Sequence, residues 1–586
     1  MAEKEENKIN KIYQGGYSSL DPEKNYVGNF LGVHVPSGDF ALTTDPRNAN
    51  FLQEVSSKLS TGVKHIEVEG ISPDIFESVP QQHLKEINRL AKLTGVEVTL
   101  HGPLIEASGF TKEGWSESNR QSAERQMIQA IERAHEINPE GSSPVTFHSS
   151  VILPGQIKPK GKEEVEEILV INPQKGSINR IPIKERHFPE EGKINVKKEI
   201  QKINEEVWDQ QLRNLAYYSD MGIDAIEKSK YLELGAMEEE KEGIAISPEF
   251  QRGRSTFNRG VTFLNDSYRE FKDLYEIAYS NSNSEQKKVL NKLGEEITKK
   301  VQKINEAPRS KQSIVLRKEI IDKGIETLNN FTEVPEIYRP LEDFAREKSI
   351  DTFASVALNS YKKFKDKAPI ISIENPPAGA AFSTGEELKK LVEESRKKFV
   401  EFAKKDGISE SEAKAQAEKL IGVTWDVGHI NMLRKYGYEN KDLVKESEKI
   451  KPLLKHIHLS DNFGFEHTEL PMGMGNVPMK EIMKKLGKEG FEAKKVIEAG
   501  NWWQHFKSPP VKESLEAFGS PIYSMKMAPY WNQSIGLYQG YFGGVGPVFP
   551  QGNYNTFGAG FSQLPMELGG QIPGQQGSKL SGNKME

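Results

Sequence analysis

The sequence predicts an α/β protein: a TIM (β/α)8 barrel with a large, mainly helical insertion between strands four and five and an extended Gly/aromatic C-terminal tail. Three observations lead to this prediction. Short, nearly continuous apolar runs recur along the chain, as in strands buried on both faces. Amphipathic helical patterns separate most of these runs. Six of the runs end in a histidine or a carboxylate, where barrel enzymes place their functional residues.

Eight runs are predicted as barrel strands, and helical patterns lie between most of them. In chain order the strands are Asn29–Val35, Val63–Glu69, Val96–His101, Pro144–His148, Pro369–Glu374, Gly422–Asp426, Leu454–Leu459 and Lys494–Ala499. The clearest barrel helices are Gln81–Thr94, Ser118–Ile137, Ser349–Lys367, Thr384–Leu420, Asn440–Lys451 and Met479–Gly490. Strand followed by helix, repeated eight times, is the pattern of a TIM barrel.

The fourth and fifth strands are separated by a segment too long for one helix. We therefore predict barrel strands one to four in residues 1–150, an inserted subdomain on the active-site face in 151–350, and strands five to eight in 351–508. The insertion contains a candidate hairpin (EEILVINPQKGSINRIPIKE) and helices over Gln286–Ala307 and Lys311–Phe331. Residues 509–586 are rich in Gly, Gln and aromatic residues, and such a composition does not form a core of its own.

Composition excludes several classes of site. The chain has 586 residues and a formal net charge of -6, so no strong global field attracts nucleic acid, although a local basic groove can still bind phosphates. The sequence contains no cysteine, which excludes disulfides, thiolate catalysis and cysteine zinc sites. The charged N-terminus and the lack of any run near about 18 apolar residues predict a cytoplasmic protein without a membrane span.

The polar strand ends predict a metal centre, because the carboxyl ends of barrel strands converge. Imidazole and carboxylate ligands suit zinc, manganese or cobalt. Strands five to eight offer one position for an ion, and strands three and four offer a second, with Glu374 or Glu498 bridging the two. A third position would use residues just beyond the strand ends. The candidate ligands are His101, His148, Glu374, Asp426, His429, His458, His467 and Glu498.

Other polar and aromatic residues near the strand ends have two interpretations each. Trp502 and Trp503 would stack on a base or a sugar ring, or pack under the strand-eight loop. His34 would line the pocket or make a structural hydrogen bond. Glu67 and Glu69 would support the ligands or be solvated. His456 alternates with His458 and is therefore expected to point away from it and to be structural.

These motifs resemble the xylose isomerase-like TIM-barrel superfamily (AP endonuclease family 2), and within it the endonuclease IV family. That resemblance implies a trinuclear zinc cluster held by two early histidines and by the Glu, Asp-x-x-His, His and Glu of the later strands. The matching residues are His101, His148, Glu374, Asp426, His429, His458 and Glu498. His467 matches the histidine of an Asp-x-His pair, but Phe465 stands where that pair has its aspartate.

The resemblance implies two alternative reactions. An endonuclease IV-like chain would use zinc to hydrolyse phosphodiesters in DNA with an abasic site. A sugar or sugar-phosphate isomerase or epimerase would instead hold one ion, manganese or cobalt, and use Glu374 and Glu498 as its acid/base pair. Loop seven, DNFGFEHTELPMG, lacks the arginine that such epimerases often carry. A barrel that only binds sugar or nucleic acid is a third alternative.

Overall fold

The computed structural model defines two compact units, each described here by itself. The first comprises residues 1–112, 116–163 and 345–586, and the second comprises 113–115 and 164–344. His34, Trp503, the predicted strand Asn29–Val35 and the predicted tail 509–586, apart from Pro510 and Ser514, lie outside the described residues. The described residues are 40–45, 47–59, 63–141, 143–161, 167–182, 196–229, 248–306, 311–331, 334–500, 502, 510 and 514.

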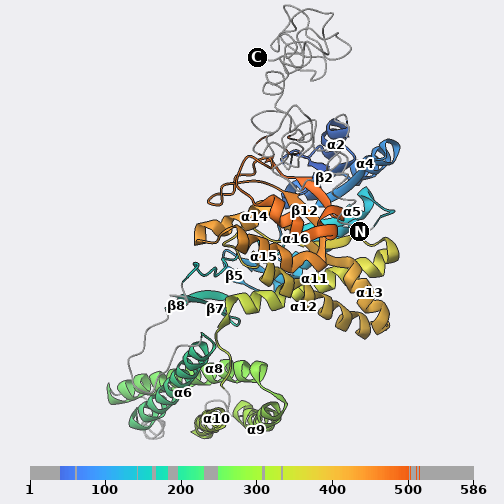
Figure 1. Ribbon diagram of the computed structural model, residues 1–586. Coiled ribbons are helices and arrows are strands. Elements are labelled where there is room, and N and C mark those ends of the chain that lie inside the picture. The colour runs from blue at the N-terminus through green and yellow to red at the C-terminus, as the bar shows by residue number, and fades with distance from the viewer. Residues whose placement is uncertain are drawn as a thin grey trace, which may run out of the picture. The chain divides into compact units, whose positions relative to one another are not determined.

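The first unit is built on a closed barrel of eight parallel strands, in the order β1-β13-β12-β11-β10-β6-β3-β2 (Figure 1). This confirms the predicted fold class. The strands are β1 (Phe40–Thr43), β2 (His65–Glu69), β3 (Glu97–His101), β6 (Pro144–His148), β10 (Ile370–Glu374), β11 (Ile421–Asp426), β12 (Leu454–Leu459) and β13 (Lys494–Ile497). The register of β6 against β10 pairs His148 with Glu374, so these two polar strand ends are adjacent.

Seven predicted strands are confirmed to within about two residues, the usual uncertainty of element boundaries. The first prediction is wrong, because the barrel begins with Phe40–Thr43 and not with Asn29–Val35. Two short apolar runs compete for this position within a few residues. Phe40, Ala41 and Leu42 are all buried, and their pairing with β13 and β2 closes the barrel.

Helices separate the strands, as expected, with one difference. The predicted helix Thr384–Leu420 is two helices, α12 (Gly385–Lys405) and α13 (Glu410–Leu420). Gly407 has a φ of 82°, a left-handed conformation that ends α12, and the Ser409 side chain then caps α13. The other helices of this part of the chain are α2 (Phe51–Leu59), α3 (Pro73–Ser78), α4 (Gln81–Thr94), α5 (Glu117–Ile137), α11 (Leu341–Phe364), α14 (Val427–Asn431), α15 (Asn440–Ile450) and α16 (Met479–Glu492).

The barrel interior just before the strand ends is polar. The Thr99 hydroxyl donates to Glu67 Oε2 at 2.7 Å, and Thr424 donates to Ser372 at 2.7 Å. Thr146 Oγ1 lies 3.1 Å from Thr424 Oγ1 and 3.4 Å from His456 Nδ1. Barrel interiors are usually filled by Val, Ile and Leu. This layer of six residues, Glu67, Thr99, Thr146, Ser372, Thr424 and His456, is called the polar layer below.

In its described residues, the second unit contains a three-stranded antiparallel sheet and four long helices (Figure 1). The predicted hairpin is present as β7 (Glu167–Asn172) and β8 (Ser177–Pro182), with β9 (Arg339–Pro340) beside β7. The helices are α6 (Val196–Ser229), α8 (Pro248–Asn281), α9 (Ser284–Glu306) and α10 (Lys311–Asn329). None of the helices in the described ranges combines the length and apolar character needed to cross a bilayer.

Candidate metal centre

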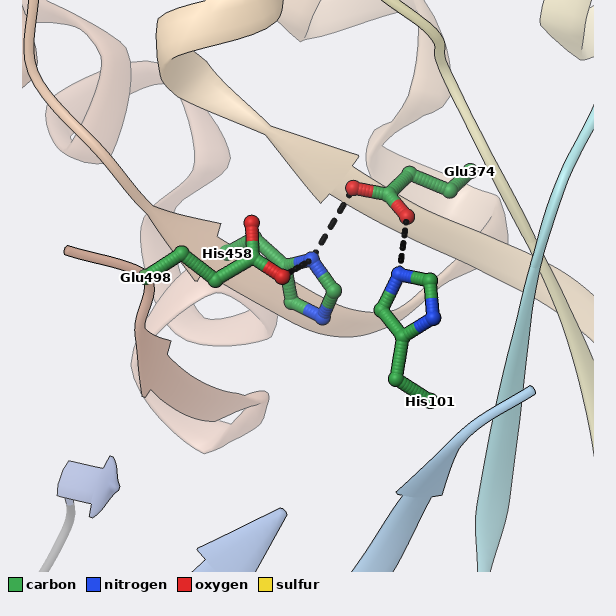
Figure 2. Close-up of side chains that lie close together, drawn as sticks. All are labelled: His101, Glu374, His458 and Glu498. Carbon is green, nitrogen blue, oxygen red and sulfur yellow. Dashed lines mark hydrogen bonds and ion pairs between the residues drawn. The ribbon is translucent and has the colours of Figure 1, made fainter. Parts of the chain in front are cut away.

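Glu374, the last residue of β10, lies at the centre of the polar strand ends and is fully buried. Its Oε2 atom is 3.3 Å from Nε2 of His101 and 3.3 Å from Nε2 of His148. Its Oε1 atom is 2.9 Å from Nδ1 of His458. Figure 2 shows one oxygen of this carboxylate facing His458 and the other facing His101. One carboxylate therefore presents its two oxygens to two different groups of imidazoles.

His458 brings Glu498 into the same cluster. Its Nδ1 atom is 2.9 Å from Glu498 Oε1 and equally close to Glu374 Oε1. Glu498 directly follows β13 and its side chain is 14% exposed, so this carboxylate reaches solvent while the other members are buried. Ligand atoms of His101, Glu374, His458 and Glu498 all lie within 4.8 Å of one another, close enough to hold one ion.

A second ligand set shares Glu374 with the first. Ligand atoms of Glu374, Asp426 and His429 also lie within 4.8 Å of one another. Asp426 caps the short helix α14, accepting from the His429 backbone N–H at 2.7 Å, and Ser460 Oγ donates to it at 3.0 Å. The His429 ring is fixed by Nδ1, 2.7 Å from the carbonyl of Asn375, which leaves Nε2 as its ligand atom.

His467 extends this second set from loop seven. Its Nε2 atom is 2.8 Å from His429 Nε2. Phe465 is 69% exposed and supplies no ligand atom. Asp461 does not replace the missing aspartate, because its carboxylate accepts the backbone N–H groups of Asn462, Gly473 and Val477 within its own loop. Glu469 approaches the pair, with Oε1 3.9 Å from His467 Nε2.

Burial and neighbouring charges shift the pKa values of the histidines and carboxylates in this cluster in opposite directions. Burial lowers the pKa of His101, but donation of its N–H toward the Glu374 carboxylate and the charge of Glu69 outweigh burial and raise that pKa to about 10. Burial lowers the pKa of His148 to about 3, despite the charge of Glu374. Burial alone would raise the pKa of Glu374, but nearby imidazoles hold it well below its usual range. A divalent cation would displace the imidazole protons and stabilise the same carboxylates.

The prediction that His456 points away from His458 is wrong, because residues two apart on a strand point to the same side. His456 is fully buried, and its ring centroid is 5.1 Å from that of His458. Its Nε2 atom is 3.7 Å from Oε2 of Glu67, whose Oε1 is 3.0 Å from His458 Nε2. Glu67 is likewise fully buried and not solvated. The alternation of polar residues in HIEVE and HIH is the sequence signal for this interior contact.

A pocket of about 170 Å³ opens beside Glu498, at the ends of β1, β2 and β13. Glu69 and Glu469 line it together with Glu498, and Arg47 and Lys58 line it from the β1–α2 region. Trp502 is half-buried and is not among the residues that line this pocket. The pocket gives the Glu498 carboxylate an opening toward solvent.

Comparison with known proteins identifies the barrel. Residues 324–519, which contain the last four barrel strands, match the family described as xylose isomerase-like TIM barrel. This match places the C-terminal half of the barrel in that superfamily. This xylose isomerase-like chain is also 31% identical over 105 residues to the uncharacterized protein MJ1311 of Methanocaldococcus jannaschii, a match that covers 18% of the chain and 34% of the relative. The chain thus spans about a third of that relative's length.

A solved structure described as that of a D-tagatose 3-epimerase-like protein is 23% identical to this chain. The match covers 36% of this chain and 71% of that chain, with a TM-score of 0.22. At that TM-score it gives no information about the reaction.

Proposed function

We propose that this chain is a metal-dependent phosphodiester hydrolase that acts on DNA with an abasic site. The observation that supports it is the placement of Glu374, whose Oε2 lies 3.3 Å from both His101 and His148 while its Oε1 lies 2.9 Å from His458. A carboxylate with imidazoles on both oxygens suits a bridge between two ions. Two-ion sites favour phosphodiester cleavage, since they stabilise both the attacking and the leaving oxygen.

The chain's own residues have distinct roles in this proposal. His101, His148 and Glu374 would hold one ion, and Glu374, His458 and Glu498 a second, with zinc the expected metal. Asp426, whose ligand atoms lie with those of His429, would serve the next position. A divalent cation supplies Lewis-acid chemistry, polarising a phosphoryl oxygen and lowering the pKa of water. His429 and His467 would contribute a weaker third position. Glu498 is the cluster carboxylate that lines the pocket, so it is placed to take a proton from water that enters there.

A second candidate is isomerisation or epimerisation of a small sugar phosphate. The pocket of about 170 Å³ beside Glu498 favours it, because that volume suits a small molecule and Arg47 and Lys58 line the same space. In this reaction Glu374 and Glu498 would exchange protons with the carbon next to the sugar carbonyl. One manganese or cobalt ion would be enough.

One assay separates the two candidates. The protein loaded with zinc, manganese or cobalt is offered an abasic DNA duplex and a panel of ketose and aldose phosphates. We expect strand cleavage with zinc and two or more ions per chain by elemental analysis. Glu374→Gln should lose metal and cleavage together. Glu97→Gln should keep both, because Glu97 pairs with Lys494 and His65 at the opposite end of its strand.

Sugar interconversion without cleavage under any metal would overturn the hydrolase and favour the isomerase. Retention of the full metal content by Glu374→Gln would contradict the site itself.

A further inference from the structure

Glu67 is a fully buried carboxylate in the polar layer, two residues before the end of β2. Its Oε1 atom lies 3.0 Å from Nε2 of His458, and its Oε2 atom accepts the Thr99 hydroxyl at 2.7 Å. Oε2 is also 3.7 Å from Nε2 of His456. Glu67 contacts the candidate metal centre at His458, and one of its carboxylate oxygens also lies within 4.8 Å of one of Glu498.

His458 lies between two groups of carboxylates and has one ring nitrogen for each. Nδ1 faces Glu374 and Glu498, each at 2.9 Å, and Nε2 faces Glu67. A neutral imidazole carries one N–H donor and one lone pair. If Nδ1 is to offer its lone pair to an ion between Glu374 and Glu498, the hydrogen must be on Nε2. Glu67 Oε1, 3.0 Å from Nε2, is the carboxylate oxygen on that side of the ring, and a small turn of the ring would let it accept this hydrogen, because neither atom has another hydrogen-bond partner among the described residues.

We propose that Glu67 is a positioning residue that holds His458 in the Nε2–H form, so that Nδ1 is the atom that ligates the metal. The inference rests on the metal centre of the proposed function, but not on the reaction catalysed there. An imidazole ligand that donates its second N–H to a carboxylate is fixed in orientation and becomes a stronger ligand. Glu67 therefore acts on the ion through His458 and touches neither ion nor substrate.

The surroundings of Glu67 argue against a simple filling role. A buried carboxylate costs stability unless it is paired, and an apolar side chain would fill a barrel interior without that cost. The polar layer instead fixes the carboxylate, with Thr99 donating to Oε2 and His456 beside it. His456 is in turn 3.4 Å from Thr146 Oγ1. A network that holds one carboxylate in one orientation is what positioning of His458 requires.

The test compares zinc affinity in Glu67→Leu, Glu67→Gln and the wild-type protein, by competition with a chromogenic chelator. Loss of the acceptor in Glu67→Leu should weaken zinc binding by about 10- to 100-fold. Glu67→Gln keeps a carbonyl acceptor but loses the charge, so its affinity should fall by a smaller factor, about tenfold. Glu97→Gln removes a carboxylate from the other end of β3 and should bind zinc as the wild type does.

A second readout reports the ring itself. In zinc-loaded wild-type protein labelled with [15N]histidine, the His458 signals should show a protonated Nε2 and a ligating Nδ1, and Glu67→Leu should lose that pattern. Thermal unfolding shows which variants fold. If Glu67→Leu does not fold, the zinc affinity and histidine signals of Glu67→Gln decide whether Glu67 positions His458.

The outcomes separate the inference from the proposed function. Unchanged affinity in both variants, or zinc on Nε2, would overturn the role of Glu67. A wild-type protein that binds zinc but cleaves no DNA would overturn the hydrolase, while the affinity comparison would still decide the role of Glu67. A wild-type protein that binds no metal would overturn both.

Discussion

At the scale of single residues, His101 and His148 distinguish a multinuclear centre from a single-ion centre. Each places Nε2 3.3 Å from Glu374 Oε2, whereas His458 faces Oε1 of the same carboxylate. If they are ligands, His101→Ala and His148→Ala should each remove about one ion per chain and leave the ion held by His458 and Glu498. Elemental analysis after dialysis measures this. An unchanged count in both variants would contradict a second ion.

The same residues set the pH dependence of metal binding. Because burial is outweighed by the charges of nearby carboxylates, the pKa of His101 is about 10, and this imidazole is protonated at neutral pH. A metal must displace that proton, so apparent affinity should rise with pH by about tenfold per unit for each proton released, up to about pH 10. His148, with a pKa of about 3, should release none at neutral pH. Calorimetry in buffers of different ionisation enthalpy measures the number of protons released when the metal binds. If no proton were released, His101 would not be protonated in the metal-free protein.

At the scale of elements, loop seven between β12 and α16 holds an incomplete third position. His429 and His467 place their Nε2 atoms 2.8 Å apart, and Phe465 is 69% exposed. Phe465→Asp should therefore cost little stability, add up to one zinc ion per chain and increase cleavage of abasic DNA. Phe463, 55% exposed in the same loop, provides the matched control Phe463→Asp, which should add no zinc. Equal zinc content in the two variants would show that the loop does not present residue 465 to the histidine pair.

The elements also show why the sequence predicted some features and missed others. Polar residues at strand ends could be predicted to converge because parallel strands in a barrel end at one face. The position of the first strand could not be predicted, since two short apolar runs fit it. Only the pairing of Phe40–Thr43 with β13 and β2 shows which run forms the strand. The contact between Glu67 and His458 joins β2 to β12, strands that are not neighbours in the barrel. Alternation predicts which side chains face inward, but not which of them meet across the interior.

At the scale of the whole molecule, the insertion separates two halves of one barrel. β6 and β10, on either side of it in sequence, pair over five residues from Pro144↔Ile370 to His148↔Glu374. The ligands are divided in the same way, with His101 and His148 before the insertion and the others after it. Deletion of residues 164–340 with a short Gly/Ser linker should therefore leave a chain that unfolds cooperatively and binds zinc as the full protein does.

The half-chain 1–163 is the control for that deletion, because it ends with unpaired strand edges and lacks Glu374. It should show no cooperative transition and no tight zinc binding, as measured by calorimetry and elemental analysis. If the half-chain unfolded cooperatively by itself, or if the deleted chain lost its zinc, then the barrel would not be the unit that folds and holds the ions. With zinc retained, any loss of cleavage in the deleted chain would measure what residues 164–340 contribute to substrate, separately from the chemistry at Glu374.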